Sequence, residues 1–416
     1  MPNTFNEDSS TIKFDPKAIA NAFAHIESYW TDLTRSQTVD DGTLVGLPHP
    51  YIIPSLRTDA SFGFEEMYYW DSYFMAQGLL ATGHDEMAEG MLENLLVLAR
   101  RFHIIPNASR MYFTSRSQPP FLTSYIFDIY EKQDKDINWL TERLKVAEQE
   151  YHNVWISDGH PNWRTVFEGL SRYYDINLID HLAEAESGWD MTTRFQGKCL
   201  SYIPIDLNSL LYKYETDFAR GAELAGNHDT ASIWRERARK RAETITKHLW
   251  DDEKGFFFDF DYMTQEKSPV WSLASLYPLW SGLATSEQAR RIVENLHHFM
   301  YKGGLVTTRN PNEWDGDLPT QWAYPNGWAP LQWIAVHGLK SYGHYNEAET
   351  IARSWVANNL QNFERNGVFR EAYNVIDPEL PPRPGLYPPQ LGFGWTNSVF
   401  IDLSKKFLSE EELLLV

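Results

Sequence analysis

Several stretches of the chain place hydrophobic residues three or four positions apart, the spacing of one helix face. In residues 86–102, Met87, Met91, Leu95 and Leu98 fall on one side, and charged residues fill the other. This pattern predicts an amphipathic helix that packs against a core. The same spacing predicts helices over further segments, namely 207–224, 230–250 and 345–363.

Capping and turn residues add shorter elements to this prediction. Thr285 and Gln288 have the spacing of a capping box ahead of a hydrophobic run. Ser409 and Glu412 predict a cap on a last short helix. The best strand candidate is the run GFFFDF at 255–260, which follows a polar turn and predicts a hairpin.

The helical segments alternate with longer irregular stretches that contain most of the Gly and Pro residues and seven of the 16 Trp residues. Loops presented by a rigid scaffold often carry function, so the pattern predicts a large helical domain with one elaborated loop face. No linker, low-complexity tract or constant repeat is present, and we predict a single domain over 1–416, with an N-terminal helix and extension in 1–45. The pattern does not distinguish a barrel from a solenoid. The irregular stretches are 44–75, 103–124, 157–195, 303–330 and 365–398.

Charge and composition exclude several classes of protein. The chain has 37 Lys and Arg against 57 Asp and Glu, a net charge of −20, which argues against nucleic-acid and membrane-surface binding. No hydrophobic run is long enough to span a membrane, and the polar start shows no signal peptide, so we expect a cytoplasmic protein. The single cysteine, Cys199, excludes an intrachain disulfide. Metal, phosphate-loop and serine-elbow motifs are absent, so no metal or cofactor is expected. Charge says nothing about oligomeric state.

The composition is unusually aromatic, at 15% with 16 Trp residues, and aromatic side chains gather around carboxylates. The first such cluster runs from Phe64 to Phe74 and contains Glu65, Glu66, Trp70 and Asp71. Sugar rings offer apolar faces for stacking and hydroxyls for carboxylates, so this composition is typical of a carbohydrate site. Taken alone, the cluster is better explained by a buried aromatic helix face with solvated glutamates.

Two further clusters carry polar groups in extended or loop-like segments. Arg116 and Gln118 are alternate residues of an extended segment, so both can point the same way and bind hydroxyls. In the second cluster, Gly188 permits close backbone approach, and Asp190 follows Trp189, whose apolar ring would raise the pKa of this carboxyl. A loop-bracing role for the arginine and an Asx-turn role for the aspartate stay open.

The last two clusters lie in the C-terminal third. Residues 320–330 contain Trp322 beside Asn326-Gly327, a dipeptide that predicts a tight turn. Glu371 lies between aromatic residues, away from any helix face, and either pairs with Arg370 or takes part in chemistry.

Taken in order, these clusters resemble the trehalase family, glycoside hydrolase family 37. The resemblance covers roughly residues 50–400. It implies an (α/α)6 barrel, with six helical hairpins in two layers and loops that form a pocket, and metal-free hydrolysis with inversion at the anomeric carbon. The segments that carry it are YYWDSYF at 68–74, HIIPNASRMYFTSRSQPP at 103–120, ESGWDMTTRF at 186–195, IPIDLNSLLYK at 203–213, QWAYPNGWAPLQW at 321–333 and GFGWTN at 392–397.

The resemblance also implies roles for individual residues. Asp190 matches the general acid of the family, and Glu371 matches the general base. A small saccharide is the implied substrate. The residues expected to bind it are Phe64, Trp70, Asp71, Asn107, Arg116, Gln118, Gly188, Trp189, Gln321, Trp322, Trp328, Tyr387 and Trp395.

The chain departs from the family pattern where the family grips its disaccharide. Gly63 stands where a family arginine is expected, and Arg57 would replace that arginine if 58–63 is an insertion. Ala323 and Leu386 stand where carboxylates are expected, and an Arg-Pro-Glu segment is missing near 176–185. Pockets that lose polar partners for hydroxyls lose selectivity.

Three functions follow from these observations. The first is an inverting hydrolase that splits α,α-trehalose into two glucoses. The second keeps this chemistry and acts on another small α-glucoside, such as glucosylglycerate or an α-linked oligosaccharide, with Arg383 meeting an anionic group. The third is a sugar-binding relative without catalysis.

Overall fold

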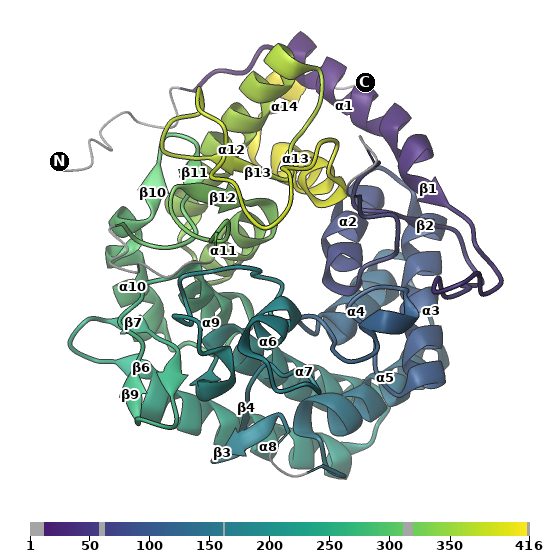
Figure 1. Ribbon diagram of the computed structural model, residues 1–416, viewed down its shortest axis with the longest axis vertical. Helices are drawn as coiled ribbons and strands as arrows, with labels where there is room; N and C mark the ends of the chain where they lie inside the picture. Colours follow the sequence, from purple (N-terminus) through teal and green to yellow (C-terminus); the bar gives the residue numbers. More distant parts are fainter. Residues whose placement is uncertain (1–11, 58–62, 161–162, 311–318, 414–416) are drawn as a thin grey trace.

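The computed structural model describes residues 12–57, 63–160, 163–310 and 319–413. Within them, helices alternate along the chain between an outer and an inner layer of a ring (Figure 1). The outer helices are α1 (Pro16–Leu33), α3 (Asp85–Phe102), α5 (Ile137–Glu150), α8 (His228–Leu249), α10 (Ser286–Glu294) and α12 (Tyr345–Asn366). The inner helices are α2 (Tyr69–Ala81), α4 (Leu122–Lys132), α7 (Ile205–Leu224), α9 (Tyr277–Trp280), α11 (Ala329–Ser341) and α13 (Gly394–Phe407).

The ring closes because α13 packs against α2, and each other inner helix contacts the next along the ring. This arrangement is an (α/α)6 barrel, which confirms the predicted fold class. The helices predicted over 86–102, 207–224, 230–250 and 345–363 are α3, α7, α8 and α12. The capping box of Thr285 and Gln288 is formed at the start of α10, and Ser409 with Glu412 caps α14 (Glu410–Leu413).

Several inner helices were wrongly assigned to irregular stretches. Helix α2 begins inside 44–75, α4 inside 103–124, α11 inside 303–330 and α13 inside 365–398. Almost every residue of α2, and the first eleven of α13, are buried. A helix that is covered on all sides needs no polar face, so its sequence lacks the alternation that reveals an outer helix.

Short antiparallel strand pairs lie among the loops rather than in one large sheet. The strand predicted over 255–260 divides: β7 forms the expected hairpin with β6, whereas β8 joins β5 and β9 instead. The pairs are β1 (Thr34–Arg35) with β2 (Tyr51–Ile52), β3 (Thr165–Phe167) with β4 (Leu170–Ser171), β6 (Trp250–Asp251) with β7 (Phe256–Phe257), β10 (Met300–Tyr301) with β11 (Gly304–Leu305), and β12 (Asn326–Trp328) with β13 (Ala372–Asn374). The three-stranded sheet is β5 (Tyr202–Ile203), β8 (Phe260–Asp261) and β9 (Glu266–Lys267).

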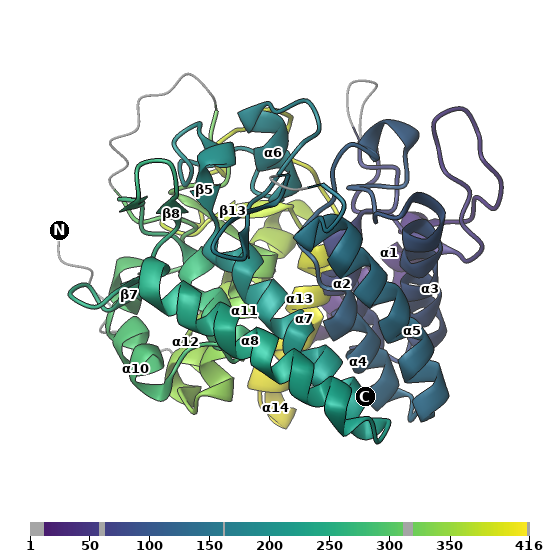
Figure 2. The same ribbon diagram turned by 90° about the horizontal axis from the view of Figure 1, so that it is seen from below.

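Seen from the side, helix α6 (Asp180–Glu186) and strands β5, β8 and β13 gather at one end of the barrel, with the long helices below them (Figure 2). The remaining short helical turns are Met111–Phe113, Tyr151–Ile156, Cys199–Ser201, Leu273–Leu276 and Leu296–His298. Among the described helices, none is long and apolar enough to cross a membrane.

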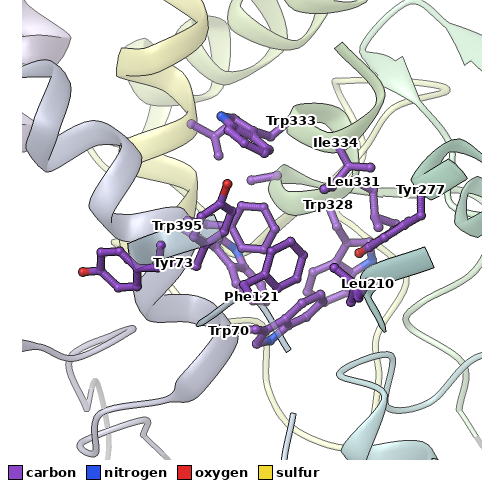
Figure 3. Packing of buried hydrophobic residues seen from close by; sticks show 14 of the residues in the cluster. Trp70, Tyr73, Phe121, Leu210, Tyr277, Trp328, Leu331, Trp333, Ile334 and Trp395 are labelled. Carbon is purple, nitrogen blue, oxygen red and sulfur yellow. The ribbon is translucent and has the colours of Figure 1, made fainter. Parts of the chain in front are cut away.

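Aromatic side chains fill the interior of the ring and come from several inner helices (Figure 3). Tyr73 of α2 stacks on Phe121, with ring centroids 4.7 Å apart, and meets Trp333 of α11 edge to face. Large rigid rings bury much apolar area and stabilise this core. Part of the aromatic surplus is therefore packing, and it holds the inner helices around the site above it.

Candidate active site

A cavity of about 470 Å³ opens at the loop end of the barrel. Its walls come mainly from the segments that lead into inner helices α2, α4, α11 and α13, together with the acid-bearing segment after α6 and the residue before β13. Twelve of the predicted site residues line it. They are Phe64, Trp70, Asp71, Asn107, Arg116, Gln118, Gly188, Asp190, Trp322, Glu371, Tyr387 and Trp395.

Three predicted substrate-binding residues lie behind the wall instead. Among the residues that the structure describes, the cavity lining does not include Trp189, Gln321 or Trp328. The indole of Trp328 stacks on Trp322, with centroids 3.8 Å apart and planes 6° from parallel. The ring centroid of Trp189 lies 5.7 Å from that of Trp322. Trp189 and Trp328 therefore both pack behind the indole of Trp322, which lines the cavity. In the sequence, an aromatic residue that packs behind the cavity wall looks the same as an aromatic residue that lines the cavity.

The cavity also contains residues that the sequence-based prediction of substrate contacts missed. Glu66 and Tyr68 belong to the first aromatic cluster, and Arg110 follows the Asn107 motif, so the same segments pointed to them. Tyr112 and Phe113 lie on the short turn Met111–Phe113, whose two aromatic rings have centroids 4.7 Å apart. The others are Ala185 and Phe393, together with Arg57 and Gly63, which had been named only as a possible replacement pair.

Two glycines allow close packing at the site. Gly188 has a φ of +74°, and a Cβ there would lie 2.6 Å from the indole of Trp70, so the predicted close approach is confirmed. The turn predicted at Asn326-Gly327 is displaced: the amide of Asn326 donates to the carbonyl of Ala323, and residues 326–328 then form strand β12. Gly327 is needed for packing, since a Cβ there would lie 2.4 Å from Val375.

Buried hydrogen bonds hold the segment that carries Asp190. The carboxylate of Glu186 accepts from the amides of Ser117 and Tyr174 at 2.8 and 2.7 Å. It also forms a buried ion pair with Arg164. The amide of Trp322 donates to the carbonyl of Met191, directly after Asp190. These bonds join the Asp190 segment to the walls on both sides, so the carboxyl has a fixed position in the cavity.

The environment of Asp190 favours its protonated form. Burial raises the pKa of this carboxyl to about 7, while a backbone hydrogen bond and the charge of Arg116 oppose the rise. A carboxyl that keeps its proton near neutral pH has the property required of a general acid.

Glu371 is buried directly before β13, and its carboxylate has two hydrogen-bond partners. Its Oε1 accepts from the Tyr387 hydroxyl at 2.8 Å, and its Oε2 faces the amide of Gln390 at 3.5 Å. Burial raises the pKa of Glu371 to about 8, these hydrogen bonds lower it, and the charges of Asp190 and Asp71 raise it further. Its partners are thus Tyr387 and Gln390, and not the neighbouring Arg370.

The raised pKa of Asp190 predicts a stability gain in Asp190→Asn. An ordinary aspartate in the unfolded chain loses its proton near pH 4, whereas folded Asp190 keeps its proton up to about pH 7. Raising the pH through this window therefore destabilises the folded protein. We expect Asp190→Asn to have the higher melting temperature at pH 8 and to match the unmodified protein near pH 4. Calorimetry at both pH values measures this, and an equal or lower value for the variant at pH 8 contradicts it.

Each arginine at the cavity has a carboxylate partner. Arg116 pairs with Asp175 at 3.2 Å, Arg110 with Glu66 at 2.5 Å, and Arg57 with Glu65 at 3.0 Å. Arg57 also packs beside Gly63, which fits its expected replacement of the family arginine; the rest of the expected insertion, 58–62, lies outside the described residues. Arg383 is exposed and is not among the described residues that line the cavity, so an anionic group would not meet it there.

The described ranges contain no group of three or more His, Cys, Asp or Glu side chains that is placed to hold a metal ion. The polar groups in the cavity are carboxyls, arginines, amides and tyrosine hydroxyls, which suit a substrate rich in hydroxyl groups.

A family model described as Trehalase matches residues 2–181 and 180–407. The chain belongs to the trehalase family. It is 32% identical to a periplasmic trehalase of Pseudomonas aeruginosa, over 97% of this chain and 80% of that protein. It is 34% identical to a cytosolic neutral trehalase of Kluyveromyces lactis, over 88% of this chain and 57% of that protein.

A solved structure supports the same assignment. The neutral trehalase of Saccharomyces cerevisiae superposes with a TM-score of 0.75 at 32% identity, covering 88% of this chain and 74% of that one. This member of the trehalase family is a glycoside hydrolase with the (α/α)6 fold of its relatives. The two positions at which the family pattern predicts carboxylates carry apolar side chains here: Ala323 is buried, and Leu386 is half exposed. Neither is among the described residues that line the cavity.

Proposed function

We propose that this trehalase-family protein hydrolyses α,α-trehalose, a small saccharide, to two molecules of glucose with inversion. The observation that carries the proposal is the pair Asp190 and Glu371, which approach one cavity from different segments in a chain that belongs to the trehalase family. Relatives whose names state trehalase activity support the choice of substrate. The two sugar rings would bind to Trp70, Trp322 and Trp395, which line the cavity, and to the surrounding amides and arginines.

In this mechanism Asp190 is the general acid. It gives its proton to the glycosidic oxygen as the bond to the anomeric carbon breaks, so the second glucose leaves as a neutral alcohol. Glu371 is the general base and takes a proton from a water molecule that attacks the opposite face of that carbon. Inverting enzymes keep these two carboxyls roughly 6.5–9.5 Å apart to leave room for the water.

In the free protein the pKa of Glu371, about 8, lies above that of Asp190, about 7, so the substrate itself would set the two protonation states. The glycosidic oxygen only accepts hydrogen bonds, so it favours the protonated form of Asp190, whereas the attacking water donates to an ionised Glu371. Because the charge of Asp190 raises the pKa of Glu371, ionisation of one group disfavours ionisation of the other. The Tyr387 hydroxyl and the Gln390 amide favour the anion on Glu371.

The stereochemistry of the products tests this proposal. Inversion of α,α-trehalose releases one glucose initially in the β form and one in the α form. Proton NMR of the first minutes of the reaction, recorded before mutarotation, should show both anomers in equal amounts. Absence of hydrolysis, or α-glucose as the only first product, contradicts the proposal.

The structure also favours a second candidate, hydrolysis of another small α-glucoside. Tyr112 and Phe113 give the cavity aromatic surface, and Leu386 supplies no carboxylate to grip a second sugar. Fewer polar partners for hydroxyls reduce discrimination between leaving groups. A panel of neutral and anionic α-glucosides, compared by kcat/KM, decides between the two. Trehalose as the best substrate dismisses the second candidate.

We also propose the cytoplasm as the compartment. The relatives are named as periplasmic in bacteria and cytosolic in yeast. The fold contains one cysteine, the buried Cys199, so it needs no disulfide and no oxidising compartment. Fractionation of the source cells, followed by trehalose hydrolysis in each fraction, measures the location.

A further inference from the structure

Gln321 is buried behind the cavity wall, at the point where the segments of the two candidate catalytic carboxyls meet. Its side-chain nitrogen Nε2 donates to the main-chain carbonyl of Asp190 at 2.9 Å. The same side chain hydrogen-bonds the hydroxyl of Tyr387. That hydroxyl donates to Oε1 of Glu371 at 2.8 Å. An unbroken series of hydrogen bonds thus runs from the acid segment to the base carboxyl.

The loop around Gly385 is shaped to admit Gln321. A Cβ on Gly385 would lie only 1.4 Å from Oε1 of Gln321 and 2.7 Å from its Cβ. No side chain is possible at this position while Gln321 keeps its place. The chain therefore has a glycine two residues before Tyr387, where the close contact requires one.

We propose that Gln321 and Tyr387 are positioning residues: Gln321 orients the Tyr387 hydroxyl toward Glu371 and ties it to the Asp190 segment. The amide hydrogens of Gln321 engage the Tyr387 oxygen, which leaves the hydroxyl proton for Glu371. A hydrogen bond from a fixed neutral donor stabilises the glutamate anion that the base function needs. The inference rests on the proposed function, since it assigns how the base is kept ionised.

Other charged groups also act on Glu371 and have to stay in place during a test. Asp190 and Asp71 face it and raise its pKa, and Arg116 acts on Asp190. Arg57, Arg110 and Glu66 line the same cavity. None of these groups is altered in the variants below, so a change in pH dependence reports on the hydrogen-bond series.

The experiment measures kcat/KM against pH, because this ratio reports the pKa values of the free enzyme. In Tyr387→Phe, Glu371 loses one of its two donors and ionises at higher pH. Because the pKa of Glu371, about 8, lies above that of Asp190, about 7, Glu371 titrates on the basic limb. This limb should move up by about one pH unit, with about a tenfold loss of kcat/KM below it. Gln321→Met should move the limb in the same direction by about half a unit, because the hydroxyl remains but is no longer oriented.

Two further variants separate positioning from general damage. Gly385→Ala should displace Gln321 and reproduce the shift of Gln321→Met. In the double variant Gln321→Met/Tyr387→Phe, the limb should lie where Tyr387→Phe alone places it, because Gln321 acts through that hydroxyl. Gln332→Met is the matched control: Gln332 is a buried glutamine that bonds both main-chain groups of Leu305, and its loss should leave the limb in place.

The outcomes distinguish the two proposals. If the unmodified enzyme does not hydrolyse trehalose or any other α-glucoside, the proposed function fails. If it is active but Tyr387→Phe leaves the basic limb unmoved, or the shifts of Gln321→Met and Tyr387→Phe add in the double variant, the positioning role is wrong. If Gln321→Met does not fold, the shift in Gly385→Ala decides.

Discussion

Replacing Asp190 by Asn, or Glu371 by Gln, should each lower kcat on trehalose about 10²- to 10⁴-fold, the range typical of positioned acids and bases. Both side chains reach the cavity, and both replacements keep their shape while removing the ability to exchange a proton. Initial rates on trehalose, with circular dichroism to confirm folding, measure this effect. Retention of more than a tenth of the activity by either variant contradicts its assignment.

A substrate with a better leaving group separates the two roles. Fluoride leaves α-glucosyl fluoride with little need for a proton, so loss of the general acid should matter little with this substrate. Asp190→Asn should therefore recover most of its activity on α-glucosyl fluoride relative to trehalose, whereas Glu371→Gln should stay inactive on both. The opposite pattern would exchange the two assignments.

The second large effect is expected on stability, in Arg194→Met. The guanidinium of Arg194 is fully buried, lies 4.7 Å over the Trp189 ring, and donates to both Asp206 and Asp259 at 2.6–2.8 Å. Its removal leaves two buried carboxylates without their counter-charge. Breaking a buried ion pair by removing one partner costs about 3–5 kcal/mol of unfolding free energy. Urea unfolding at pH 7 measures this cost.

Two controls show whether the missing counter-charge is the cause. Adding Asp206→Asn and Asp259→Asn to Arg194→Met should recover part of the lost stability, because neutral amides need no counter-charge. Arg239→Met removes an exposed arginine that pairs with Glu236 and Glu243, and it should leave the urea midpoint unchanged. Failure of the asparagine pair to recover any stability would indicate that lost packing against Trp189 is the main cost.

Much of the candidate site follows from local sequence. Trp70 and Asp71 lie at the start of α2, and Arg116 and Gln118 lie in the stretch before α4, and all four reach the cavity as expected. A short segment that leads into a helix leaves few directions for its side chains. A motif of polar and aromatic residues in such a segment therefore points to the site.

The errors have a common physical cause. Trp189 and Trp328 have the same neighbours in sequence as true wall residues, but they lie behind Trp322. Gln321 was expected to touch the substrate, and it bonds the Asp190 carbonyl instead. For Trp189 and Gln321, the contacts that decide between facing the cavity and supporting its wall are with segments more than a hundred residues away, and no local pattern contains that information.

By itself, the sequence determined outer helices α3, α8 and α12 and inner helix α7, because one face toward the core and one more polar face impose an alternation that can be read directly. It also determined the family and the two candidate carboxyls, through motifs that span most of the chain. Only the tertiary structure revealed inner helices α2 and α13, which are largely buried and so show no such alternation. It alone brought Gln321, Tyr387, Asp190 and Glu371 into one series of hydrogen bonds, since the ring must close before these distant segments meet.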